Sequence, residues 1–517
     1  MKYLKLIAGG VASLLIITFL AKLNYVRALH LAGDTAGYVD LLKHIYRFND
    51  MRSSVFAAAY PVFDLTKTAA GVCSSALLNT YEQASFFRWH SYGLAFPIAW
   101  IGGRLTNDFA AVAAVVNALS VYGIFAAALL IARKQKFNLI EIGLFALLLV
   151  SFTPLVGAIS GQYYFDRLFI PLALFYYYLH LENERRACWI ASVAVIICAA
   201  LVSERSSLMI GALAIYLSAF DTKDKKAYRL LTIGAGLLAI GYYVLWSKVF
   251  QNSLYASTTS LSAMMANVRT IFDLSSPLSM MTRELLVVLL PMLVLLFGNK
   301  KYLLLALAFL APNLLLTVGG AEKTGYATHY HSYYIPIILF GALMGYARYK
   351  QSISNIALRY ALLVVLLVCN IANIHNRQFP VGPTLTHTLS GDAAMLVEGT
   401  ARQQAAQAWV SGLNELLSLI DKPDPTISAN EFVMPIMVSR NITRIRLFPI
   451  GLYDSDYLLI ESAAGGDDSQ IILPIYGDPA DLQDIVKCLY PKIGERFTEI
   501  GSKEILGIKY RLFKAKQ

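Results

Sequence analysis

The sequence predicts a mostly α-helical, polytopic membrane protein with about 11–13 transmembrane helices and a small C-terminal extracytoplasmic α/β domain. Of its 517 residues, 57% are hydrophobic and only 15% are charged, whereas a soluble domain has about 25% charged residues. The long apolar runs lie almost entirely in residues 1–374, and residues 375–517 alternate between short helix and strand patterns. This composition excludes an ordinary cytosolic enzyme and a disordered chain.

The basic excess belongs to the apolar part of the chain. Residues 1–374 contain 30 Lys and Arg against 16 Asp and Glu, and residues 375–517 contain 14 against 17. Such a distribution indicates membrane topology and attraction to lipid headgroups, so we expect no nucleic-acid partner. The cysteines are scattered and form neither a disulfide framework nor a metal-ligand cluster: Cys73, Cys188, Cys198, Cys369 and Cys488.

A bilayer core requires about 20 apolar residues of helix. The candidate spans are roughly 4–22, 86–106, 109–132, 137–156, 168–181, 187–203, 206–220, 230–247, 284–298, 301–318, 333–347 and 357–374. The first run lacks a convincing small-residue cleavage site before Lys22. We therefore interpret it as a retained anchor and not as a signal peptide.

Lys and Arg in short loops predict the orientation of the spans. The basic loops are Lys2/Lys5, Arg133–Lys136, Arg185-Arg186, Lys223–Arg229, Lys300-Lys301 and Arg348/Lys350/Arg359. They place the N-terminus in the cytoplasm and the tail outside. This assignment requires that the segment 86–106 does not cross the membrane fully. Pro97 and Gly102-Gly103 interrupt the segment, and irregular backbone at membrane depth is tolerated where it lines a cavity. The alternative is that the loop at 133–136 is an exception to the rule.

The first outer loop, residues 23–85, is too long to be a simple connector. The segment in it that best suits a chemical role is His30–Asp40, which starts about two helical turns after the first span. Asp34 is suited to act as a general base toward an attacking hydroxyl, with Asp40 and Asp64 as further candidates. The alternatives are that Asp34 caps the following helix and that Asp40 is a solvated helix residue.

Downstream in this loop, apolar residues are spaced as in short interfacial helices: Leu41, Leu42, Ile45 and Tyr46, then Val55 and Phe56. On that interpretation Lys43, Arg47 and Arg52 face the lipid headgroups.

Outer loops also place an acid directly beside a base: Asp166-Arg167, Glu204-Arg205 and Glu322-Lys323. If the spans form one bundle, these loop ends converge on one cavity. There Arg167, Arg205 and Lys323 would bind a phosphate or diphosphate, and Asp166 and Glu204 would line the cavity. The alternative is that each pair is a loop charge or an ion pair between helices.

The segment Ala327–Tyr334 places two histidines among aromatic residues. A zinc site requires three or four ligands, so His329 and His331 alone are weak evidence for metal. We expect His331 to contact the phosphate and His329, Tyr333 and His90 to line the cavity. The alternative is a position at the membrane interface, where Tyr is enriched. We predict no cofactor apart from a lipid-linked substrate; a divalent metal stays open but is not indicated.

The tail predicts a small α/β domain. We expect helices at 401–419 and 479–489, and strands at 426–429, 444–448, 457–461, 470–475 and 508–513.

Several of these residues form motifs. Asp34, Gly37 and Tyr38 give an acid, a glycine and an aromatic residue after the first span. The second motif is Trp89-His90-Ser91, followed by Gly93 and Pro97. The third is Ser203-Glu204-Arg205, and the fourth consists of His331, Tyr333 and Pro336. With them the chain resembles the bacterial membrane-protein family known as domain of unknown function 2079. That family is similar in layout to the glycosyltransferase C superfamily of polyprenyl-phosphate-sugar-dependent enzymes.

The tail carries the same resemblance, in the order Ser428-Ala429-Asn430, Pro435, Ser439-Arg440, Phe448-Pro449 and Asp456-Tyr457. The resemblance implies a transmembrane glycosyltransferase C-like module, residues 1–374, followed by an extracytoplasmic domain, residues 375–517. It further implies inverting sugar transfer at the outer face of a bacterial cytoplasmic membrane. The catalytic acid would be Asp34, and Tyr38 would line the cavity.

The partners expected from this resemblance are a polyprenyl-phosphate carrier and a glycan, lipid or protein acceptor. The sequence sets neither the sugar nor the oligomeric state. One alternative is a transporter or flippase of a lipid-linked glycan or another anion, although transporters often show related halves and this chain shows no internal repeat. A second alternative is an outer-face glycan polymerase.

Overall fold

The computed structural model describes residues 33–53, 87, 90–155, 164–220, 226–250, 261–273, 275–315, 329–375, 401–430, 433–440, 442, 444–448, 451–463, 471 and 479–516. This part of the chain forms two compact units. The bundle unit takes its described residues from 87–94 and 115–375, and the sheet unit takes its own from 33–53, 95–114 and 401–516. The described part of the first outer loop therefore groups with the tail.

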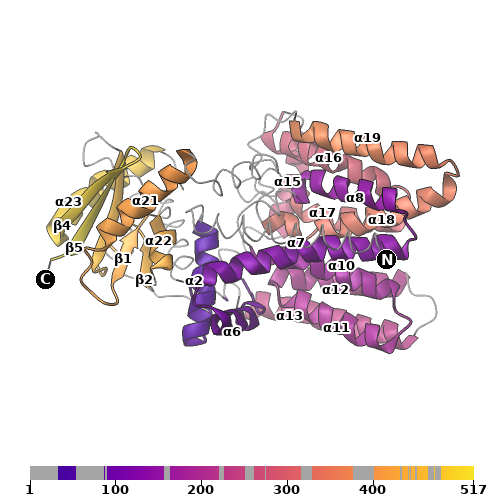
Figure 1. Ribbon diagram of the computed structural model, residues 1–517, viewed down its shortest axis with the longest axis horizontal. Coiled ribbons are helices and arrows are strands. Elements are labelled where there is room, and N and C mark those ends of the chain that lie inside the picture. The colour runs from indigo at the N-terminus through magenta and orange to yellow at the C-terminus, as the bar shows by residue number, and fades with distance from the viewer. Residues whose placement is uncertain are drawn as a thin grey trace. The chain divides into compact units, whose positions relative to one another are not determined.

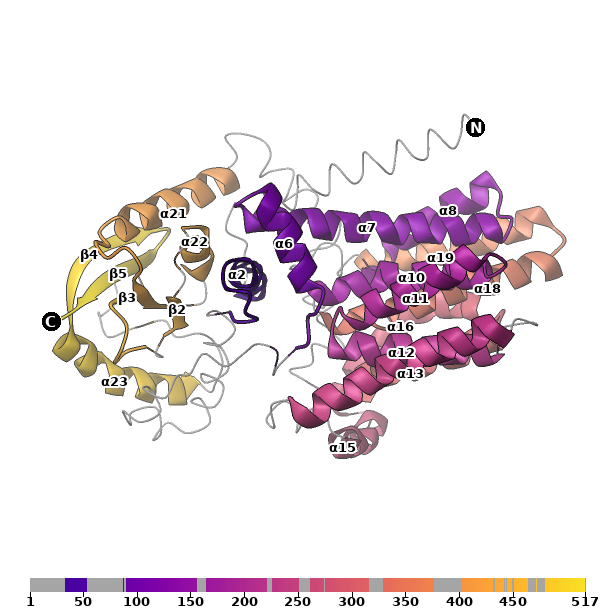
Figure 2. The same ribbon diagram turned by 90° about the horizontal axis from the view of Figure 1, so that it is seen from below.

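The bundle unit is built from α-helices, most of which run lengthwise beside one another (Figures 1 and 2). They are α7 (Phe109–Lys134, of which residues 109–114 group with the sheet unit), α8 (Leu139–Ser151), α10 (Phe169–Leu181), α11 (Arg186–Ala200), α12 (Glu204–Phe220), α13 (Lys226–Val249), α15 (Leu261–Phe272), α16 (Pro277–Leu296), α17 (Lys300–Leu315), α18 (Ile335–Ser352) and α19 (Ile356–His375). Two 3-10 turns, η2 (Phe165–Leu168) and η3 (His329–Ser332), precede α10 and α18.

Glycines allow two of these helices to pack closely. A Cβ added to Gly211 of α12 would lie only 2.6 Å from the carbonyl oxygen of Gly236 in α13. Small residues at such crossings are typical of membrane helices, where association depends on close van der Waals packing.

Four helices in the described residues are long and apolar enough to cross a membrane: Phe109–Lys134, Lys226–Val249, Ser279–Leu296 and Ile356–Asn373. α8 and α11 are apolar but shorter. The mostly helical fold with a small C-terminal sheet domain is therefore confirmed, and these helices support membrane association. The number of 11–13 spans and their orientation stay predictions, and the expected anchor at 4–22 lies outside the described residues.

The Glu141 carboxylate interacts with both the α7–α8 and the α18–α19 connection, at the end of the bundle that carries the described basic loops. Glu141 is fully buried and accepts a 2.8 Å hydrogen bond from the Asn138 backbone N–H, which completes a capping box at the start of α8. Lys350 Nζ lies 2.7 Å from its Oε2 and Arg359 Nη1 lies 3.8 Å from its Oε1. The Tyr346 hydroxyl donates to Oε1 at 3.2 Å. The α7–α8 and α18–α19 connections thus share one buried anion.

We expect Glu141→Gln to lower the free energy of unfolding by about 3 kcal/mol, because it leaves two cations without their buried counter-charge. Thermal unfolding of the purified protein in detergent measures the loss. Glu182→Gln is the matched control, since the Glu182–Lys134 pair (2.8 Å) is partly exposed and such pairs contribute about 0–1 kcal/mol. Equal losses in the two variants would contradict this account.

The sheet unit contains five strands in the order β2-β1-β3-β5-β4 (Figure 1). They are β1 (Thr426–Ala429), β2 (Arg444–Leu447), β3 (Tyr457–Ala463), β4 (Phe497–Ile505) and β5 (Ile508–Ala515). β1 is parallel to β2 and β3, whereas β5 is antiparallel to β3 and β4. The helices are α21 (Ala401–Leu417), α22 (Met434–Ser439) and α23 (Pro479–Arg496).

Most tail elements confirm the sequence predictions. Both predicted helices are present, and so are four of the predicted strands. Of the expected strand 470–475, only Ile471 is described, and it forms an isolated bridge with Ser462. Neither α22 nor β4 was predicted from local patterns, and the hairpin that β4 forms with β5 turns through Leu506 and Gly507. Both turn residues have positive φ angles, which favours Asn and Gly, so a leucine there hides the turn signal.

Two helices of the sheet unit precede the tail in sequence, α2 (Gly33–Phe48) and α6 (Ala95–Leu105). They pack on each other, and a Cβ added to Gly103 would lie 2.5 Å from the Tyr46 ring. α6 has 11 residues and is about 17 Å long, shorter than a bilayer core. The segment 86–106 therefore contains no described helix long enough to cross fully.

The expectation that Lys43 faces headgroups is wrong. This side chain is only 3% exposed, because α2 packs on α22 of the tail. Its ammonium lies 3.5 Å from the carbonyl oxygen of Val438, near the end of α22. Burial lowers the pKa of Lys43 to about 8, although the nearby Asp40 charge partly offsets that effect.

A second buried acid lies in the sheet itself. Glu461 of β3 is 2% exposed, and burial raises its pKa from the ordinary 4.5 to about 7. A carboxyl with a raised pKa in the folded state binds its proton more tightly there than in the unfolded chain. The contribution of Glu461 to stability is therefore greatest below pH 4.5 and falls as the pH rises toward 7.

We expect that fall to be on the order of 3 kcal/mol between pH 4.5 and 7. Amide hydrogen exchange of β3 in the full chain, corrected for the intrinsic pH dependence of exchange, measures the opening free energy. Glu461→Gln should remove the slope. A slope that persists in Glu461→Gln would assign it to another group.

Candidate functional site

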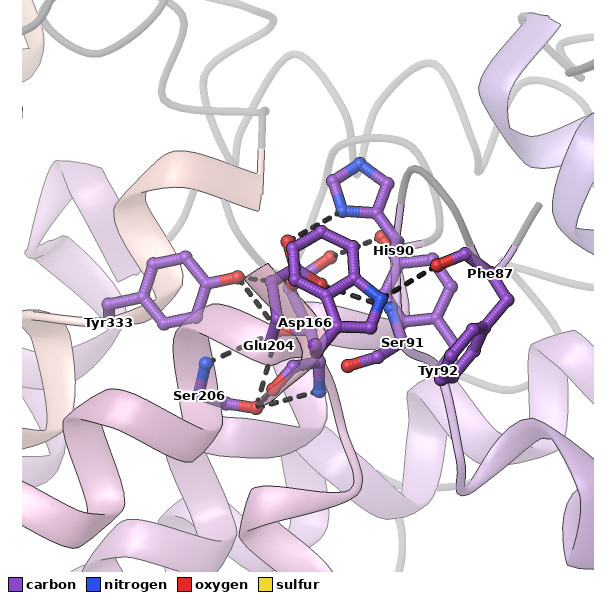
Figure 3. Close-up of polar contacts among 10 residues, drawn as sticks. Phe87, His90, Ser91, Tyr92, Asp166, Glu204, Ser206 and Tyr333 are labelled. Atoms are coloured by element: carbon purple, nitrogen blue, oxygen red, sulfur yellow. Dashed lines mark hydrogen bonds and ion pairs between the residues drawn. The ribbon is translucent and has the colours of Figure 1, made fainter. Parts of the chain in front are cut away.

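One end of the bundle unit carries a group of buried polar side chains (Figure 3). Four segments distant in sequence contribute to it, namely residues 90–94, 164–168, 201–206 and 329–334. The basic loops that the structure describes, Arg133–Lys136, Arg185-Arg186, Lys300-Lys301 and Arg348/Lys350/Arg359, lie at the other end of the bundle helices. We define the polar cluster as His90, Ser91, Tyr92, Asp166, Glu204 and Tyr333.

Local backbone contacts bring two of these segments together. The Leu94 N–H donates to the Leu201 carbonyl at 2.9 Å, just after α11. A Cβ at Gly93 would lie 2.8 Å from the Leu201 side chain, so glycine allows this approach. At the start of α12, the Ser206 hydroxyl accepts from the Ser203 N–H and donates to the Ser203 carbonyl, both at 2.7 Å. These bonds fix the corner from which Glu204 projects.

Glu204 is buried and precedes the apolar residues 206–220. Its Oε1 lies 2.9 Å from His90 Nδ1, and its Oε2 accepts the Ser91 N–H at 3.1 Å. Burial by itself would raise the pKa of this carboxyl. The neighbouring His90, Arg205 and Ser91 N–H outweigh burial, and the pKa of Glu204 is lowered. Glu204 is therefore ionised at neutral pH and fixes the orientation of the His90 ring.

Asp166, in η2, accepts hydrogen bonds from two tyrosines. The Tyr92 hydroxyl donates to Oδ2 at 2.9 Å, and the Tyr333 hydroxyl donates to Oδ1. Tyr333 reaches the acids from the side opposite to the one that carries His90 and Tyr92 (Figure 3). Its hydroxyl also lies 3.1 Å from Ser203 Oγ. Neutral hydroxyls orient this carboxyl without supplying a counter-charge.

Arg167 and Arg205, which were predicted from the sequence to bind a phosphate, lie in the same segments as Asp166 and Glu204. Arg205 is partly exposed, with its guanidinium 4.9 Å from the Tyr330 ring centroid. Arg167 is buried, with its guanidinium 5.2 Å from the Tyr164 ring centroid. Around them, η2 packs against η3. The two arginines and the two acids thus belong to one end of the bundle.

His331 is also in η3 and is fully buried. Its Nδ1 lies 2.7 Å from the Tyr334 hydroxyl. His329 begins η3, but its side chain is outside the description, and Lys323, Glu322 and Asp64 lie outside the described residues.

The residues expected from the first outer loop are in the sheet unit. Asp34 falls in the first turn of α2, where a negative charge is favourable; its side chain is outside the description. Asp40 is fully buried and accepts the Ser53 hydroxyl at 2.9 Å, so the alternative of a solvated helix residue is wrong. Tyr38 is buried on the same helix.

Several members of this site were not found from the sequence. Tyr92 was missed, and Ser203 was given no role, because their partners Asp166 and Tyr333 are more than 70 residues away in the chain. At the end of α13, the Trp246 indole donates to the Phe87 carbonyl at 2.7 Å. The one sequence signal was an aromatic run near a span end, which is also typical of an ordinary interface belt.

In the part of the chain that the structure describes, no three His, Cys, Asp or Glu side chains gather in a way that could hold a metal ion. The polar cluster presents two carboxyls that are oriented by hydrogen bonds, beside tyrosine hydroxyls and two arginines.

Comparison of the chain with protein-family models gives no match. Comparison with curated proteins gives no match either. The resemblance to glycosyltransferase C-like enzymes therefore stays a prediction that rests on the motifs themselves.

Proposed function

We propose that the protein is an integral-membrane glycosyltransferase that moves a sugar from polyprenyl phosphate to an acceptor hydroxyl on the extracytoplasmic face. The observation that carries this proposal is the buried polar cluster at the end of the bundle opposite the basic loops. Ionisable groups among apolar helices are energetically expensive and mark functional sites by default. By the positive-inside rule, that end faces outward.

The donor phosphate would bind to the arginines of this end. Arg205 is partly exposed and sits beside an aromatic ring, a setting in which a guanidinium keeps its planar fork for a phosphate. Arg167 and His331 would complete the anion site, with Lys323 as a further candidate. The apolar polyprenyl tail would lie against the helices.

Glu204 and Asp166 would orient the sugar and the side chains that contact it. Glu204 holds His90 through a 2.9 Å contact, so the imidazole is presented in one orientation. The Asp166 carboxyl, held by two tyrosine hydroxyls, is an acceptor for sugar hydroxyls. Groups held in this way need no reorganisation during the reaction, which is the basis of electrostatic preorganisation.

Asp34 is proposed as the general base on the strength of its motif. Its carboxylate takes the proton of the acceptor hydroxyl while that oxygen attacks the anomeric carbon. The bond from the anomeric carbon to the phosphate oxygen breaks, and its electron pair leaves with polyprenyl phosphate. The new glycosidic bond forms with inverted configuration.

Transfer and flipping are distinguished in proteoliposomes. Purified protein is supplied with radiolabelled polyprenyl-phosphate sugars and with membrane extract as a source of acceptors. We expect label to move from the carrier to a new product, and Arg205→Ala to weaken donor binding. Movement of the labelled lipid across the bilayer without a new product would replace this proposal with the transporter alternative.

A further inference from the structure

The sheet order places a topological switch point in the tail. β1 lies between β2 and β3, to which it is parallel. After β1 the chain continues through α22 to β2 on one side of β1, and it then returns to β3 on the other side. In open α/β sheets, ligands bind outside the carboxyl ends of the strands at such a reversal.

Two buried polar side chains meet at this edge of the sheet. Asn430 follows the last residue of β1 directly, and Glu461 lies two residues before the end of β3. The Asn430 amide donates to Glu461 Oε2 at 3.3 Å, and both residues are 2% exposed. In the described part of the chain, Glu461 Oε1 has no hydrogen-bond partner.

An unpartnered buried acceptor carries a desolvation penalty that folded proteins seldom tolerate without a reason. A ligand that donates a hydrogen bond to Oε1 would remove this penalty. Burial also raises the pKa of Glu461 to about 7, so the group accepts more strongly once it ionises above that value.

Aromatic groups lie beside this acid. Tyr510 of β5 is directly opposite Glu461 in the antiparallel register, so the two side chains share a face of the sheet. The Trp409 indole, from α21, donates to the Tyr510 hydroxyl at 2.7 Å. Tyr510 is itself buried, so a carboxyl, an amide and a phenol lie together at a polar position that suits a ligand with several hydroxyl donors, as a saccharide is.

We propose that Glu461 and Asn430 form a binding site for a saccharide, with Glu461 Oε1 accepting a sugar hydroxyl. The site deepens the proposed function, on which its biological role rests, because it would hold the glycan acceptor in the tail.

The test is saccharide binding to the purified full-length protein in nanodiscs. Saturation-transfer NMR with a panel of hexoses, N-acetylhexosamines, hexuronic acids and their disaccharides identifies a binder and its Kd. We expect Glu461→Gln to weaken binding about tenfold or more, the scale for loss of a hydrogen bond to a charged group, and Asn430→Ala to weaken it in the same direction. Glu415→Gln is the matched control, since Glu415 is an exposed acid of α21 paired with Lys503.

Unfolding midpoints of all variants establish that they are folded. No binding by the wild type across the panel would overturn the site, and so would unchanged binding by folded Glu461→Gln. Transfer activity is a separate readout. Saccharide binding without sugar transfer would contradict the proposed function but support the binding site. Sugar transfer with an unchanged acceptor KM in Glu461→Gln would contradict the binding site but support the proposed function.

Discussion

Asp34→Asn is expected to reduce sugar transfer by about 10²- to 10⁴-fold, the usual contribution of a general base. The amide keeps the size of the side chain but cannot accept the hydroxyl proton. Because Asp34 falls in the first turn of α2, loss of its charge should remove only about 0.3–1 kcal/mol of helix-dipole stabilisation. Turnover measured at saturating donor, with the unfolding midpoint alongside, separates catalysis from folding.

The matched control is Asp40→Asn in the same helix. Asp40 is buried and accepts the Ser53 hydroxyl at 2.9 Å, and an asparagine can still accept that bond. We expect a loss of stability in this variant and little loss of turnover per folded molecule. A fully active Asp34→Asn, or a loss of turnover confined to Asp40→Asn, would assign the base elsewhere.

Glu204→Gln is expected to lower turnover about 10²-fold. The neutral amide weakens the 2.9 Å contact with His90 Nδ1, so the imidazole loses its fixed orientation, and misplacements of about 1 Å cost that much in rate. The charge is present at neutral pH because the pKa of Glu204 is lowered. Its contribution to stability is therefore complete above the ordinary value of 4.5 and is lost only as the pH falls through the lowered pKa.

Glu184→Gln, at an exposed position in the loop after α10, removes the same charge away from the cluster and should leave turnover unchanged. Glu204→Asp, which restores a carboxylate, should recover part of the activity of Glu204→Gln. Equal turnover in Glu204→Gln and wild type would show that the buried pair is structural only.

Local sequence patterns predicted the secondary structure well because their signals are short-range. The strands at 426–429 and 457–461 alternate with helices that carry amphipathic periodicity, and the structure confirms them. β4 escaped because Leu506 occupies a turn position with positive φ, a conformation that leucine rarely adopts. Local signals thus fail where tertiary packing imposes an uncommon backbone conformation.

The site was predicted in part, for a related reason. Asp166 and Glu204 were identified because charges that interrupt apolar runs are rare and conspicuous. Tyr92 was missed because its role depends on Asp166, 74 residues away. Lys43 was wrongly expected at a lipid surface, since nothing local reports that α22 of the tail covers it.

Photo-crosslinking with polyprenyl phosphate is the measurement that tests the central claim most directly, because it needs neither the native sugar nor the acceptor. A photoreactive polyprenyl phosphate is bound to the full-length protein, activated, and located by peptide mass spectrometry. We expect crosslinks in the segments of the polar cluster, residues 90–94, 164–168, 201–206 and 329–334, and their loss in Arg205→Ala. Crosslinks confined to the opposite end of the bundle, around Glu141 and the basic loops, would contradict the account.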